Sequence, residues 1–152
     1  MSLKTKTTNF LNQKRIAVAG VRSTQDDAAN GIFRKLRDEG YTVFAVNPSV
    51  ESVEGETCYP NVQSIPGGVE GVVIVTSPKI TEQVVRDCVD ANVRSVWMHK
   101  SMGNSVSEEA VKFAEEHGIE VIAGACPMMY CNPDIFHRCM RWMMGVTGGL
   151  PN

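Results

Sequence analysis

Short apolar runs alternate with segments of helical periodicity along this chain, and that alternation restricts its fold more than any other feature. The runs are rich in valine and isoleucine, which is typical of strands buried on both faces of a sheet. Five runs stand out, at 15–19, 41–46, 71–75, 93–98 and 119–123. Strands that alternate with helices pair in parallel through right-handed crossovers. The pattern therefore predicts an α/β protein with a buried parallel sheet.

Helix signals lie between these runs. Ser77-Pro78 is an N-cap followed by a proline at the first helical position, with Ile80 on the predicted inner face of the helix. The next helix begins at Ser105, as part of a capping box, or at Ser107. The remaining predictions are a leading helix at 8–13, a helix from 26–27 to Gly40, a loop at 50–60, a helical turn at 61–65 and a last helix at 133–144.

Connecting these elements gives a Rossmann-like three-layer sandwich. We predict that its five parallel strands, numbered along the chain, have the order 3-2-1-4-5. The strand order then reverses between the first and fourth strands, and ligands of such folds bind at the carboxyl ends of the strands beside that reversal. The loops that converge there begin at Gly20, Asn47, Thr76, Met98 and Gly124.

Length and charge limit the classes of function. The 152 residues suit one domain at 1–152, with a leading segment at 1–13 and a C-terminal helix and tail at 132–152. The formal net charge of −2 argues against nucleic acid as the main partner. We see no signal peptide or membrane-spanning stretch, and the five cysteines suggest no disulfide framework. We therefore expect a cytoplasmic protein with reduced thiols and no membrane partner.

The first run ends in the turn around which the predicted site is organised. Ile16–Ala19 stops at Gly20, and Arg22, Ser23 and Thr24 follow before the next helix. The N–H groups of such a turn and the positive end of the helix dipole face the same space, which suits a phosphate. Arg22 adds a charged donor. Alternatively, Gly20 only permits the turn and Arg22 is solvated.

Two features argue against ordinary NAD binding at this turn. The dinucleotide fingerprint needs G-x-G-x-x-G, but Val21 follows Gly20. The acid that would bind an NAD ribose at the end of the second strand is replaced by Asn47-Pro48. An NAD(P)-type redox protein or sensor is therefore the alternative function.

These residues belong to a wider pattern. The chain has Ile-Ala-Val-Ala-Gly-Val-Arg-Ser at 16–23, Gly-Tyr-Thr-Val-Phe-Ala-Val-Asn-Pro at 40–48, Thr-Ser-Pro at 76–78, Val-Trp-Met at 96–98 and Cys-Pro at 126–127. Over about 14–130 it resembles the small bacterial CoA-binding domain proteins, which are similar to the N-terminal domain of succinyl-CoA synthetase α-subunits. The resemblance implies a Rossmann-like fold that binds coenzyme A (CoA) or an acyl-CoA.

The resemblance also implies which residues bind the ligand. The phosphate-bearing portion would lie on the turn formed by Gly20, Val21, Arg22 and Ser23, with Asn47 and Pro48 as the adjacent wall. The nucleotide side would be lined by Thr76, Ser77 and Pro78, with Met98, His99 and Lys100 across from them.

The chain departs from the family at two points. Ser49-Val50-Glu51 stands where related synthetase domains have a lysine for a CoA phosphate, and an acidic loop weakens such a contact unless Arg22 or Lys100 compensates. The loop 99–105 is longer than usual in the family. The synthetase's catalytic histidine lies in another domain, so the resemblance carries no ligase activity to this chain.

Cysteine and histidine side chains allow further alternatives. Cys126 follows the last strand, and with His99 it could form a thiolate–imidazole nucleophile; the commoner outcome is a buried, inert pair. Cys126 and Cys131 could hold zinc with His99 or His137, but their C-x₄-C spacing is loose for a structural site. We assign no catalytic residue and no metal ligand.

The last predicted helix, at 133–144, carries more apolar surface than a small outer helix needs. Trp142 and Met144 extend beyond its inner face, which indicates packing within the chain or a homodimer interface. The function predicted from the whole sequence is that of a stand-alone CoA- or acyl-CoA-binding protein with no catalysis of its own. A Cys126/His99-dependent enzyme is a further alternative.

Overall fold

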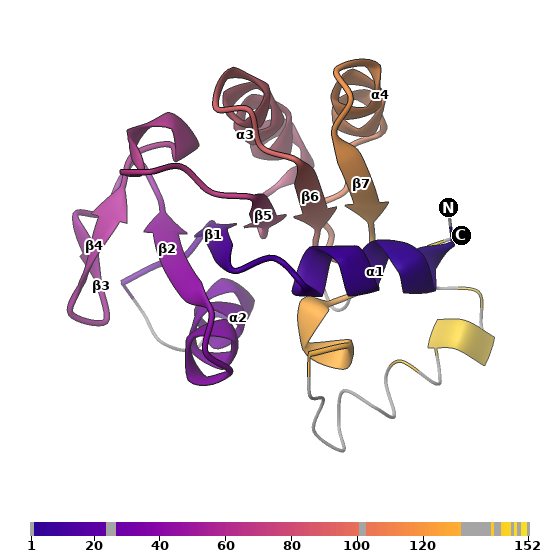
Figure 1. The fold of residues 1–152 in the computed structure, drawn as a ribbon, viewed down its shortest axis with the longest axis horizontal. Coiled ribbons are helices and arrows are strands. Elements are labelled where there is room, and N and C mark those ends of the chain that lie inside the picture. Colours follow the sequence, from indigo (N-terminus) through magenta and orange to yellow (C-terminus); the bar gives the residue numbers. More distant parts are fainter. Residues whose placement is uncertain are drawn as a thin grey trace.

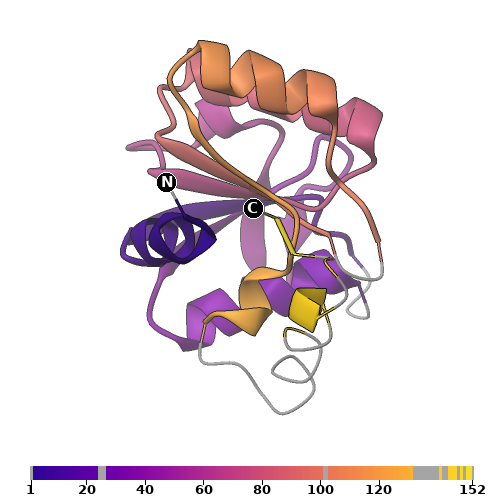
Figure 2. The same cartoon turned by 90° about the vertical axis from the view of Figure 1, so that its right-hand side faces the viewer.

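The computed structural model describes residues 2–23, 27–100, 103–131, 141, 144–146, 148 and 150–151. A central sheet lies between two layers of helices, with α3 and α4 on one face and α2 on the other (Figure 1). Figure 2 shows the same layers from the side, with α4 above the sheet and α2 and η2 below it. The predicted α/β, Rossmann-like three-layer architecture is therefore confirmed.

The elements follow the order expected from the sequence. The strands are β1 (Arg15–Ala19), β2 (Thr42–Val46), β3 (Ser52–Val53), β4 (Glu56–Tyr59), β5 (Gly71–Ile74), β6 (Ser95–Met98) and β7 (Glu120–Ala123). The helices are α1 (Leu3–Leu11), α2 (Ala28–Asp38), α3 (Pro78–Asp90) and α4 (Glu108–Glu116), with short 3₁₀ helices η1 (Val62–Ser64) and η2 (Pro127–Met129).

The predicted sheet is wrong in strand number and order. The sheet has seven strands in the order β3-β4-β2-β1-β5-β6-β7. It is mixed, because β3 pairs with β4 antiparallel while the other pairs are parallel. The run at 71–75, predicted to lie outside the second strand, is β5 and instead pairs directly with β1.

The error comes from segment 50–60, predicted as a loop because of its three glutamates. It forms the β3–β4 hairpin, whose turn contains Glu54 and Gly55 at positive φ. Only Val53 and Cys58 of its strand residues are buried, so the apolar signal is weak. Because β4 takes the place beyond β2, counting β4 as the third parallel strand gives the order 3-2-1-4-5-6.

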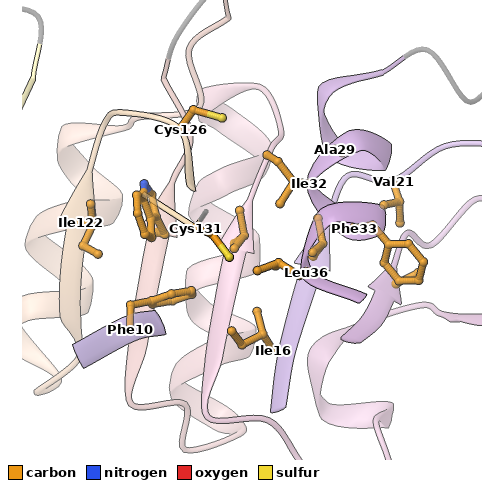
Figure 3. Close-up of a cluster of buried hydrophobic side chains, with 14 of the residues drawn as sticks. Phe10, Ile16, Val21, Ala29, Ile32, Phe33, Leu36, Ile122, Cys126 and Cys131 are labelled. Carbon is orange, nitrogen blue, oxygen red and sulfur yellow. The ribbon is translucent and has the colours of Figure 1, made fainter. Parts of the chain in front are cut away.

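Two apolar cores flank the sheet. One lies between the sheet and α2, where Ile32, Phe33 and Leu36 are nearly completely buried (Figure 3). The other lies under α3 and α4 and includes Val85, Cys88 and Ala114. Buried β-branched residues of the strands supply both cores, as expected for strands covered on both faces.

Several helix boundaries differ from the prediction. Helix α1 begins at Leu3, earlier than predicted, with the hydroxyl of Ser2 as its N-cap acceptor. Ser107 is the N-cap of α4, whereas the hydroxyl of Ser105 accepts a hydrogen bond from the Thr76 N–H. Ile80, predicted on the inner face of α3, is 55% exposed. The predicted last helix, at 133–144, lies almost wholly outside the described residues.

Helix α1 lies against β7, the last strand of the sheet (Figure 1). The Lys6 ammonium group donates a hydrogen bond of 3.0 Å to the carbonyl oxygen of Val121 in that strand. No helix in the described part of the chain is long and apolar enough to cross a membrane.

Candidate functional site

The strand order reverses between β1 and β5, not between the predicted first and fourth strands. From β1 the sheet continues to β2 on one side and to β5 on the other. The two crossovers to α2 and α3 therefore leave opposite faces of the sheet at neighbouring positions. In open α/β sheets the crevice at this reversal is the usual ligand site.

A cavity of about 560 Å³ lies at this point. Its walls come from the ends of β1, β2, β4 and β5, from η1 and from the face of α3 that extends to Asp87. That volume is within the range of small-molecule sites. Its described lining residues are Ala19, Gly20, Arg22, Val46, Asn47, Pro48, Ser49, Pro60, Asn61, Val62, Val75, Thr76, Ser77, Ile80, Gln83, Val84 and Asp87.

Gly20 allows the β1–α2 turn to approach β5. Its φ is +105°, and an added Cβ would lie 2.0 Å from the carbonyl oxygen of Val75. The N–H of Gly20 donates to the Val46 carbonyl oxygen at 3.0 Å, which continues the β1–β2 pairing. That N–H is therefore not directed at a ligand, and any side chain at this position collides with backbone.

Two asparagines hold the turn after Gly20. Asn30, completely buried in α2, accepts from the Arg22 N–H at 2.9 Å and donates to the Arg22 carbonyl oxygen at 2.8 Å. Asn47, at the end of β2, donates through Nδ2 to the Val21 carbonyl oxygen at 2.7 Å. The turn's backbone groups are thus largely occupied by the protein, and the predicted cradle of free N–H groups is only partly present.

Arg22 is the cation of this turn. Its Nε lies 3.0 Å from Oδ2 of Asp27, and its side chain is 70% exposed. Asp27 is the N-cap of α2 and also accepts from the Ala29 N–H. The Asp27 carboxylate therefore occupies the position at the helix N-terminus where an external anion gains most from the dipole.

The β5–α3 turn is fixed by hydroxyl groups instead. The buried Thr81 hydroxyl is 2.8 Å from Thr76 Oγ1 and donates to the Ser105 carbonyl oxygen at 2.8 Å. Ser105 Oγ accepts from the Thr76 N–H at 3.0 Å. Ser77 is the predicted N-cap of α3, but it makes no side-chain cap bond, and it lines the cavity.

The predicted binding residues separate into two groups. Those that line the cavity are Gly20, Arg22, Asn47, Pro48, Thr76 and Ser77. Those absent from its described lining are Val21, Ser23, Pro78, Met98, His99 and Lys100. Val21 and Met98 are core residues, Pro78 is the first residue of α3, and Lys100 is exposed on a bridge to Asn104 and Ala125.

Sequence reasoning missed several residues of the site. Asn30 carries no prediction in the sequence analysis, although an asparagine inside a helical pattern indicates a specific partner. Asp87 reaches the cavity from the second half of α3, where it accepts from Gln63 and Gln83, each at 3.1 Å. Its position follows only from the packing of α3 beside η1.

His99 and Cys126 are both buried, with exposed fractions of 3% and 4%. Burial lowers the pKa of His99 below its usual 6.5, against the opposing effect of the Asp27 carboxylate. Cys126 lies in the apolar core below the sheet together with Ile32 and Ile122 (Figure 3). Neither residue lines the described cavity, so the geometry favours packing over nucleophilic chemistry.

The zinc alternative finds no support. Within the described ranges, no group of three or more histidine, cysteine or acidic side chains is arranged to hold a metal ion. Cys131 instead contacts Tyr41, and burial, with a further contribution from Cys131, raises the pKa of Tyr41 to about 12. His137 lies outside the described residues.

Comparisons with known proteins identify the family of this chain. Residues 14–132 match the family model described as "CoA binding domain". The chain is 29% identical over 120 residues to an ADP-forming acetate–CoA ligase I of Archaeoglobus fulgidus, covering 74% of this chain and 18% of the ligase. It is 28% identical over 125 residues to the α-subunit of ADP-forming acetate–CoA ligase II of Pyrococcus furiosus, covering 77% and 27%.

A solved structure of a hypothetical protein from Pyrococcus horikoshii superposes with a TM-score of 0.78 at 32% identity, covering 84% of this chain and 88% of that one. The curated ligases are several times longer than the matched region, so their whole activity does not transfer with the match. All three source organisms are archaea, and the predicted bacterial origin stays a prediction. Since the family model covers most of its length, this chain belongs to the CoA-binding domain family.

Proposed function

We propose that the chain binds CoA or an acyl-CoA in the cavity between the β1–α2 and β5–α3 turns, by itself and without catalysis of its own. The observation that carries the proposal is the cavity's position at the strand-order reversal of a CoA-binding family member. The phosphates lie against Gly20 and Arg22, and the hydroxyl groups of Thr76 and Ser77 contact the nucleotide.

The apolar part of the ligand has its own surface. Val62, Ile80 and Val84 are among the residues that line the cavity. Ile80 is exposed although it is a large apolar residue, and an apolar ligand group that covers it removes that surface from water. A cavity lined by both a charged side chain and apolar side chains suits a nucleotide that carries a long organic arm.

The absence of catalysis is part of the proposal. The described lining holds no histidine, cysteine or lysine, and its carboxylate, Asp87, accepts hydrogen bonds from two glutamine amide groups. The single unit at 1–152, the homodimer through the C-terminal helix and the cytoplasmic location are proposed on sequence grounds alone.

The test is calorimetric titration of the purified chain with CoA, acetyl-CoA and NADH at low salt. We expect CoA and acetyl-CoA to bind with similar affinity, and NADH to bind much more weakly. Arg22→Ala should weaken CoA binding about tenfold and flatten its salt dependence, because a charged phosphate contact is lost.

Arg37→Ala is the matched control, since Arg37 lies in the last turn of α2, the helix that follows the Arg22 turn, and does not line the cavity. NADH binding without a CoA response would overturn the proposal in favour of a dinucleotide-dependent protein. An unchanged CoA affinity in Arg22→Ala would move the site away from this turn.

A further inference from the structure

The charge of the cavity is unusual for a site that receives a polyanion. A second hollow of about 480 Å³ adjoins the main cavity, with Asn47, Pro48, Ser49 and Pro60 in both walls, and it adds Glu51. Over both linings, as far as the structure describes them, the charged side chains are Arg22, Glu51 and Asp87. The described linings therefore carry one positive and two negative side chains.

The cation is also partly neutralised. Arg22 is paired with Asp27 at 3.0 Å. An anion that binds here competes with an internal carboxylate for its main charged partner.

Asp87 is held in place facing the cavity. The amide groups of Gln63, in η1, and Gln83, in α3, both donate to its Oδ1 at 3.1 Å. Both partners are uncharged, and no ion pair of the described residues includes Asp87 or Glu51. A fixed carboxylate of this kind accepts hydrogen bonds from hydroxyl or amino groups and repels phosphate.

CoA carries phosphate in two places, a diphosphate bridge and a phosphomonoester on the 3′-hydroxyl of its ribose. A phosphomonoester brings between about 1.5 and 2 negative charges at neutral pH. Arg22 can pair with the diphosphate. The phosphomonoester then lies beside walls whose remaining charged side chains, Glu51 and Asp87, are negative. Like charges placed together across a binding surface act as a specificity device against the ligand that carries them.

We propose that this cavity selects against the 3′-phosphate, so that its preferred ligand is a CoA-type nucleotide with free ribose hydroxyls, such as dephospho-CoA. Glu51 and Asp87 are the specificity-determining residues, and Asp87 accepts a hydrogen bond from the unphosphorylated nucleoside. This inference rests on the proposed function, because it concerns the same site and the same class of ligand.

The experiment is a pair of calorimetric titrations, with CoA and with dephospho-CoA, at about 50 mM and about 500 mM salt. We expect dephospho-CoA to bind at least about fivefold more tightly at low salt. The ratio should fall toward one at high salt, because screening weakens repulsion between charges that reach solvent. CoA binding more tightly than dephospho-CoA at low salt would overturn the inference and leave the proposed function standing.

Substitutions identify the carboxylates responsible. The double variant Glu51→Gln/Asp87→Asn should reduce the low-salt ratio to about twofold or less, mainly by improving CoA binding. The control Glu56→Gln/Asp90→Asn removes the same charge from exposed positions on β4 and α3 that line neither hollow. An unchanged ratio in the first variant, with its melting temperature retained, would overturn the roles of Glu51 and Asp87. Binding of neither nucleotide would refute the proposed function itself.

Discussion

The two turns that border the cavity are built on opposite principles. In the β1–α2 turn, asparagine side chains hold the backbone and the charged pair Arg22–Asp27 lies at the surface. In the β5–α3 turn, buried hydroxyl groups around Thr81 join the turn to Ser105. Buried hydrogen bonds therefore hold the second turn. In the first turn, hydrogen bonds hold the backbone at Val21 and Arg22, while the Arg22–Asp27 ion pair lies at the surface, where a ligand can replace Asp27 as the partner of Arg22. Stability and ligand binding should therefore respond differently to changes in each.

Gly20→Ala should have the largest effect, because it removes the close approach on which both turns depend. The added Cβ would lie 2.0 Å from the Val75 carbonyl oxygen at a φ of +105°. We expect a loss of at least about 3 kcal/mol in the free energy of unfolding, from steric overlap and backbone strain. Urea denaturation measures it. Gly103→Ala is the control, since no atom of the described residues lies within 4 Å of a Cβ there and its φ is not in the left-handed region; equal losses of stability in both variants would contradict the steric argument.

Asn30→Ala should come next, because it releases the backbone of the β1–α2 turn. The N–H and carbonyl groups of Arg22 would lose their partner in α2. An unsatisfied buried polar group costs about 1–3 kcal/mol, so we expect a loss of about 2 kcal/mol in unfolding free energy and weaker CoA binding. Asn12→Ala, at the exposed C-cap of α1, should change neither quantity. Full stability in Asn30→Ala would show that the turn is held elsewhere.

Thr81→Val should separate stability from binding at the β5–α3 turn. Valine keeps the shape of threonine but removes the hydroxyl that contacts Thr76 and the Ser105 carbonyl oxygen. We expect a loss of about 1 kcal/mol in unfolding free energy and nearly unchanged CoA affinity. Thr57→Val, at an exposed position of β4, serves as the control. A large loss of affinity at constant stability would mean that this wall is not rigid but responds to the ligand.

Asp27→Asn should have the smallest effect on the fold and a measurable effect on binding. Asparagine caps a helix about as well as aspartate, so stability should change by only a few tenths of a kcal/mol. Removing the carboxylate that pairs with Arg22 should tighten CoA binding about threefold, in the range of an exposed ion pair of up to about 1 kcal/mol. Asp38→Asn, at the other end of α2, controls for net charge. Weaker binding in Asp27→Asn would mean that Asp27 positions Arg22 for the ligand.

The predictable part of the fold followed from strong local patterns. The run Arg15–Ala19, the Ser77-Pro78 helix start and Gly40 after α2 were all confirmed. Each rests on burial or on a steric rule that acts within a few residues. The strand order depended instead on segment 50–60, where a short strand with few buried residues gives no such pattern.

The candidate site was predictable where its residues follow directly from the strands of the parallel sheet. Six predicted residues line the cavity because parallel strands bring their carboxyl ends together wherever the strands are placed. Two of its charged residues, Arg22 and Glu51, were identified from the sequence, but Asp87 and the buried Thr81 were not. Asp87 and Thr81 lie within a helix, and the packing of α3 against η1 and against Ser105 gives them the partners that lie outside that helix.

The contact of Lys6 with the Val121 carbonyl oxygen bears on how the sheet meets other molecules. An edge strand with unpaired backbone groups is a template on which a second chain can add a strand. Here α1 and a lysine guard the β7 edge, and the opposite edge ends in β3, which is two residues long. Both edges of the sheet are therefore poor templates for edge-to-edge aggregation, because α1 lies against β7 and β3 is too short to pair extensively with another strand.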